Sequence, residues 1–156
     1  MGILSELFGM KKSRTSSSNL QSAASENVYS GLTRNQKLAA MNLMMVFGGS
    51  CSGSPQELGK INHIMTEEGK RLGITGEEMH AATSRFNGME GMVDALKGAD
   101  RVALANLFWP FYCIVSVGKD EQAIRVLLAI YEDYGFSIQD CVNILEKISG
   151  RKISSI

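Results

Sequence analysis

Cys51 is the residue whose type and position come closest to those of a catalytic group. It lies in a glycine- and serine-rich run, Gly48-Gly49-Ser50-Cys51-Ser52-Gly53-Ser54. The segment that follows is predicted to begin a helix, and the partial positive charge at a helix amino terminus lowers the pKa of a nearby thiol. We therefore expect an exposed Cys51, available for a thiol-dependent reaction or for accidental oxidation. Neither His63 nor His80 adjoins it in sequence to serve as its base.

The same run is open to two further interpretations. Because helix amino termini attract anions, a phosphate-binding loop is one of them. The run follows a predicted helix instead of a strand and lacks the lysine that reaches the phosphates, which favours a loop between two helices. Such a loop offers short polar side chains to a partner, namely Ser50, Cys51, Ser52 and Ser54.

Other residues with chemical potential have an ordinary structural interpretation beside the functional one. His63 and Glu67 are four positions apart, which suits two metal ligands on one helix face, although most such pairs are solvated surface. Trp109 and its apolar neighbours form either a cofactor pocket or plain core. The nine methionines are pliable core fillers or the lining of an adaptable partner groove. Cys113 and Cys141 lie on apolar faces and are expected in the core.

Composition limits the class of protein. A chain of 156 residues with 44% hydrophobic side chains is expected to form one domain with a real core. The formal net charge is zero, so no overall field would attract nucleic acid. Three widely spaced cysteines favour free thiols and a cytoplasmic location. The first residues are too short and too polar for a signal peptide, and Glu6 occupies the position where a myristoylation motif needs Ser or Thr.

The elements that must position these residues are predicted to be helices throughout. Helix caps, apolar periodicity and glycine stops predict seven of them, at 33–48, 54–73, 75–87, 89–96, 101–117, 120–135 and 137–150. The helices at 33–48 and 101–117 are apolar on nearly every side, so we expect them at the centre with the others around them. No segment alternates with a period of two, and no sheet is expected.

The sequence repeats itself after 62 positions. Leu72-Gly73-Ile74-Thr75-x-x-Glu78 recurs as Tyr134-Gly135-Phe136-Ser137-x-x-Asp140. Each copy predicts a helix that ends at glycine, an apolar residue, and a capped helix start. The predicted fold is therefore an all-α seven-helix bundle made of two pseudo-repeats.

Two all-helical halves with this order of caps resemble the TerB-like family. That family includes tellurite-resistance TerB proteins and the TerB-like domain of a membrane-anchored DnaJ-type co-chaperone. The resemblance extends from about Leu32 to Gly150, and the opening of the chain, with Leu7-Phe8-Gly9 before a basic stretch, is similar too. It rests on the order and spacing of the pieces. It implies a TerB-like bundle with a role in stress or membrane-associated complexes.

The resemblance also implies a site for a divalent metal. Family members end the leading helix of each half with Asp-Gly, and a cap and a glutamate follow. Here Ser50-Cys51 and Val117-Gly118 stand in place of those pairs, while Ser54-x-x-Glu57 keeps the cap and the glutamate. Hard cations need several oxygen ligands. Three carboxylates remain for a weak divalent-cation site, Glu57, Asp120 and Glu121, and no other cofactor is expected.

Residues 1–31 are predicted to form a disordered leader, residues 32–150 the helical domain and residues 151–156 a tail. The leader begins with four apolar residues at helical spacing, Ile3, Leu4, Leu7 and Phe8. They form either a frayed end or a short amphipathic foot that touches a membrane surface or a partner groove.

Together these observations predict a non-enzymatic cytoplasmic interaction module. It would dock an unidentified protein partner through the loop from Gly48 to Pro55 and the helix start at Asp120, with no nucleic acid and at most peripheral membrane contact. The alternatives are a weak divalent-metal sensor at the three carboxylates and a thiol-dependent enzyme at Cys51.

Overall fold

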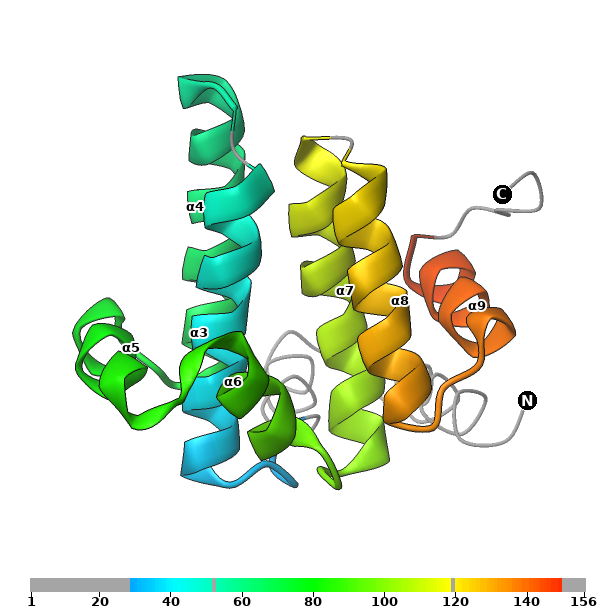
Figure 1. The fold of residues 1–156 in the computed structure, drawn as a ribbon, viewed down its shortest axis with the longest axis horizontal. Coiled ribbons are helices and arrows are strands. Elements are labelled where there is room, and N and C mark those ends of the chain that lie inside the picture. Colours follow the sequence, from blue (N-terminus) through cyan, green and yellow to red (C-terminus); the bar gives the residue numbers. More distant parts are fainter. Residues whose placement is uncertain (1–28, 52, 119, 150–156) are drawn as a thin grey trace, which may run out of the picture.

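All regular structure in the described part of the chain is helical. The computed structural model describes residues 29–51, 53–118 and 120–149, and no strand occurs in these ranges (Figure 1). The elements are α3 (Arg34–Cys51), α4 (Pro55–Leu72), α5 (Gly76–Ala82), the 3₁₀ helix η1 (Thr83–Arg85), α6 (Gly88–Leu96), α7 (Arg101–Val117), α8 (Glu121–Asp133) and α9 (Ile138–Ser149). The prediction of an all-α chain with seven α-helices is thereby confirmed for these residues. None of these helices is both long and apolar enough to cross a membrane.

Helices α3 and α7 form the centre of the bundle. They lie side by side and run in the same direction, while α4 and α8 return antiparallel to them (Figure 1). All of the larger contacts between elements involve α3 or α7, apart from those of α5 with η1 and of α8 with α9. Because both central helices are apolar on most sides, surrounding them is the way to remove that surface from water.

The packed domain begins earlier than the sequence predicted. Tyr29 lies within the expected leader, yet only 3% of its surface is exposed, and its hydroxyl donates to the Glu68 carboxylate on α4. Leu32 is buried as well. A phenol supplies both apolar area and a hydrogen-bond donor, which is why this residue is anchored. The amino-terminal apolar residues, the rest of the leader and residues 150–156 lie outside the described residues.

The repeated turn has the same geometry in both copies. Gly73 and Gly135 have φ angles of 72° and 97°, in the left-handed region where glycine is favoured. The next amide donates back five residues in each copy, from Ile74 to Gly69 and from Phe136 to Tyr131, at 2.9 Å in both cases. Reciprocal capping bonds follow, between Thr75 and Glu78 and between Ser137 and Asp140. The predicted sequence of helix end, buried apolar residue and capped start is confirmed twice.

An arginine at the start of each central helix binds the capping carboxylate of the same half. Arg34 on α3 pairs with Glu78, and Arg101 on α7 lies 3.5 Å from Asp140. The Arg101 guanidinium also donates to the Gly135 carbonyl at 3.1 Å and stacks 4.0 Å from the Phe136 ring centroid. These links tie each repeated turn to the start of its central helix. Sequence spacing alone did not reveal them.

The predicted end of the first helix at Gly48-Gly49 is wrong. Helix α3 continues to Cys51, because Gly48 faces α4 and permits close packing: an added Cβ would lie 2.8 Å from the Ile61 side chain. A still closer approach joins the far ends of the two central helices. A Cβ on Gly118 would lie 2.2 Å from the Cys51 carbonyl oxygen.

Gly118→Ala tests this close approach. We expect it to lower the free energy of unfolding by about 1–3 kcal/mol, because the added methyl group must push two backbone segments apart. Gly49→Ala is the control, since a Cβ at this exposed helical position meets nothing within 4 Å. It should leave stability unchanged or raise it by up to about 1 kcal/mol. Denaturant unfolding followed by circular dichroism measures both, and equal stability of the two variants would contradict the packing described.

Candidate binding groove

An open, apolar groove runs between α4 and α7. Its volume is about 660 Å³. Helix α4 contributes one wall, and the other comes from residues of α7 that recur every three to four positions and so share one face. The lining residues are Gly59, Lys60, His63, Ile64, Trp109, Tyr112, Cys113, Ser116 and Val117.

The aromatic wall of the groove is partly uncovered. Trp109 and Tyr112 are neither fully buried nor fully exposed, although the sequence predicted this helix to lie at the centre of the bundle with the others around it. Tyr112 stacks on the fully buried Phe108, with ring centroids 6.0 Å apart and an angle of 26° between the planes. A ring backed by the core loses little conformational freedom when a ligand binds, so this wall is suited to recognition.

The opposite wall, formed by α4, leaves open space because Gly59 has no side chain. This residue lies inside α4, where glycine is about 0.5–1 kcal/mol less favourable than alanine. No packing requires it, since an added Cβ would meet no heavy atom within 4 Å. Gly59 therefore costs stability without a structural reason in the described fold, and it leaves open space on the groove side of the helix.

Polar groups at the groove are few. The Ser116 hydroxyl is buried and has no hydrogen-bond partner among the described residues. Leaving such a group unpaired costs about 1–3 kcal/mol. Lys60 and His63 are exposed on the α4 side and give this rim a basic character.

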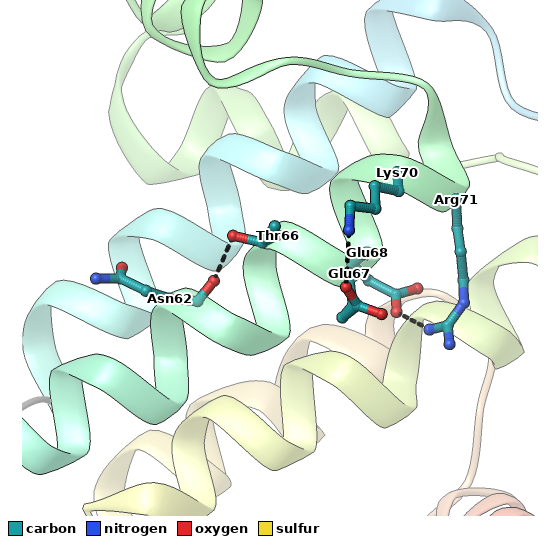
Figure 2. A network of polar contacts seen from close by, with 6 residues as sticks. All are labelled: Asn62, Thr66, Glu67, Glu68, Lys70 and Arg71. Carbon is teal, nitrogen blue, oxygen red and sulfur yellow. Dashed lines mark hydrogen bonds and ion pairs between the residues drawn. The ribbon is translucent and has the colours of Figure 1, made fainter.

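A buried carboxylate lies in the carboxyl-terminal half of α4. Glu68 is 4% exposed; it accepts a hydrogen bond from the Tyr29 hydroxyl and another, of 2.5 Å, from Arg71. Figure 2 shows Arg71 turned towards Glu68 while the neighbouring Glu67 accepts from Lys70 at 3.2 Å. Burial, and secondarily the charge of Glu68, raises the pKa of Cys113 to about 11. The thiol in the groove is therefore neutral at physiological pH.

A second groove of about 590 Å³ lies on the other side of α4. Three of the nine methionines, Met41, Met65 and Met79, line it together with Ile74 and several small or polar residues. The sequence left open whether methionines fill the core or line a groove. Here Met41 and Met79 are buried, whereas Met65 is partly exposed, so individual residues serve both purposes.

The expectation of an exposed, activated Cys51 is wrong. The side chain is 5% exposed and lies at the carboxyl end of α3, not before the start of α4. Burial raises its pKa; the hydrogen bond with Ser50 opposes this by a smaller amount, and the charge of Asp120 adds a still smaller rise. A carboxyl-terminal helix end has the opposite partial charge from the one that activates thiols.

The other residues of the predicted interaction loop are mainly used within the fold. Ser50 donates to the Phe47 carbonyl, and Ser54 caps α4 through the Glu57 amide. Ser52 lies outside the described residues. The end of this region at Cys51 lies beside the segment before α8, because the Cys51 backbone lies against Gly118 and the charge of Asp120 acts on the Cys51 thiol.

The three carboxylates proposed for metal each serve the first turn of a helix. Glu57 accepts from the Gly53 amide at 2.7 Å, Asp120 accepts from the amides that follow it at 3.0 and 3.3 Å, and Glu121 lies 3.9 Å from Arg125. In the ranges that the structure describes, no three His, Cys, Asp or Glu side chains gather as metal ligands do. The structure does not bring this set together.

Sequence reasoning considered Trp109 and His63 but did not place them at one site, and it missed Gly59 altogether. A signal was present. Helix α7 is apolar all round, whereas the α4 positions facing it, 59, 60, 63 and 64, include only one large apolar residue, Ile64. An apolar helix paired with a mostly small or polar face predicts uncovered surface.

Comparisons with known proteins add no relative. No family model matches the chain, and neither the curated proteins nor the solved structures contain a match.

The thiols should react slowly. Burial raises the pKa of Cys51, of Cys113 to about 11 and of Cys141 to about 12. Iodoacetamide alkylation of the native protein, followed by peptide mass spectrometry from pH 6 to 9, should therefore proceed more slowly at all three than at a free cysteine of pKa about 8.5. Rapid modification of Cys51 at pH 6 would contradict the geometry described.

The buried phenols should limit stability in alkali. Burial raises the pKa of Tyr29, Tyr131 and Tyr134, with the charge of Glu68 adding to the shift at Tyr29. Their contribution is complete below the unfolded pKa of about 10 and is lost as pH rises above it. We expect the free energy of unfolding to fall from about pH 10 upwards, with a shallower fall in Tyr29→Phe. Reversible ionisation of all three phenols near pH 10, with unchanged stability, would contradict this.

Proposed function

We propose that this chain is a non-enzymatic interaction module that binds an amphipathic helical segment in the α4–α7 groove. The observation that carries the proposal is the partly uncovered aromatic wall of α7. There Trp109 and Tyr112 line the groove opposite α4, which leaves open space at Gly59. Aromatic side chains in apolar grooves commonly anchor partner helices through residues spaced three and four apart.

The chemistry of the groove defines the preferred ligand. An apolar face would pack on Trp109 and Ile64, and an acidic residue at its edge would meet Lys60 and His63. The resemblance to TerB-like proteins supports a cytoplasmic role in stress or membrane-associated complexes, and that assignment remains part of the proposal. The raised pKa of Cys51 weighs against the thiol-enzyme alternative.

Site-specific photo-crosslinking in the cells that make the protein tests the proposal. A photoreactive residue placed at Lys60, on the groove rim, should give an adduct with a discrete partner. The same residue placed at the exposed Arg125 on α8 should not. Gly59→Leu should reduce the adduct from position 60 at least about tenfold, equivalent to about 1.4 kcal/mol of binding free energy, because the leucine fills the groove.

Gly49→Leu is the matched control, since a side chain at this second open helical glycine lies outside the groove. It should leave the adduct unchanged. Circular dichroism melts confirm that both variants fold. Equal adduct yields in the two leucine variants, or equal yields from positions 60 and 125, would reject the groove as the binding site.

A further inference from the structure

The amino-terminal end of the chain has the chemistry that the groove requires. We propose that residues 3–8 of the same chain occupy the α4–α7 groove and must be displaced before a partner binds. The inference rests on the proposed function, because it identifies the first occupant of that same site and thereby a form of self-inhibition.

The apolar pattern of the segment fits the groove. Ile3, Leu4, Leu7 and Phe8 have the spacing of one, four and five positions that would place four apolar side chains on one side of a short helix. The uncovered apolar surface of the groove extends along α7 from Trp109 to Val117, with Ile64 on the opposite wall. The six residues from 3 to 8 would cover about 9 Å as a helix at 1.5 Å per residue, which fits within the roughly 12 Å from residue 109 to residue 117 of α7.

The charges are complementary as well. The segment carries one charged side chain, Glu6, next to its apolar face. The groove presents Lys60 and His63 on its rim, and none of its lining residues is an aspartate or a glutamate. An acidic residue is therefore attracted at this rim by Lys60 and His63.

The chain returns to the described structure close to the groove. Tyr29 is held by Glu68, which lies on the same helix as Lys60 and eight residues, or about 12 Å, further along it. Twenty residues separate Phe8 from Tyr29. A chain of that length with random-coil statistics spans about 25 Å. The groove is within reach, and such a tether gives an effective concentration in the millimolar range.

Trp109 reports directly on the occupancy of the groove, because it is the only tryptophan in the chain and lines one wall. In the full chain, Leu7→Gln should increase acrylamide quenching of Trp109 and shift its emission to longer wavelength. Leu20→Gln, the same change beyond the segment, is the matched control and should alter neither. Equal quenching in the two variants would overturn the proposal.

A synthetic peptide of residues 1–12 provides the second readout. It should bind the Leu7→Gln chain and restore protection of Trp109. Because the unaltered chain has its groove occupied, it should bind the same peptide at least about tenfold more weakly. Glu6→Lys should weaken binding of the peptide, and Lys60→Glu in the chain should restore it. Absence of saturable peptide binding would overturn the proposal.

Two further outcomes reject it in favour of another occupant. Protection of Trp109 that disappears on dilution would identify a second copy of the chain. Leu7-dependent binding to anionic phospholipid vesicles, with Trp109 equally quenched in both leucine variants, would identify a membrane surface. If the segment fails these tests while Gly59→Leu still removes the crosslinked partner, the inference falls and the proposed function stands.

Discussion

The apolar circumference of α7 is the constraint on which the rest of the structure depends. A helix of this kind must be covered on every side, and α3, α4, α8 and α9 share that task. The cover is complete where Phe108, Phe111 and Ile114 meet the core. It is incomplete towards α4, whose facing positions carry glycine, lysine and histidine beside a single isoleucine. The bundle therefore retains an uncovered apolar strip, bounded by a rigid aromatic wall and a basic rim.

The features that hold the bundle together also define this strip. The close contact of Gly118 with Cys51 fixes one end of α7 against α3, and the link between Arg101 and the second repeated turn fixes the other end. Helix α4 packs against α3 where Ile61 lies over Gly48. Its carboxyl-terminal half is held by the hydrogen bond from the Tyr29 hydroxyl to Glu68. With both helices fixed, neither can move to close the groove without breaking these contacts. Binding there would use a preformed surface, at a small cost in ordering.

Local rules of sequence predicted the helices and the repeated turn because their causes are local. Glycine in a left-handed conformation, a buried residue after it and a capping pair act within a few residues, and both copies formed as expected. The end of α3 was mispredicted because Gly48 there serves a contact with Ile61 of α4, from farther along the chain. Cys51 was wrongly expected to be exposed, and the role of Gly59 in the groove was missed, for the same reason: the residues that face them are far away in the sequence. Whether a glycine ends a helix, permits close packing or opens a groove depends on what faces it.

We infer that the apolar strip on α7 is a binding surface and that it is covered in the native chain. Nuclear Overhauser contacts of the Trp109 indole and the Ile64 methyl groups in that chain test it most directly. We expect contacts from both residues to leucine, isoleucine or phenylalanine side chains that belong to none of helices α3 to α9. Contacts confined to those seven helices, with an indole proton that exchanges freely with water, would contradict it.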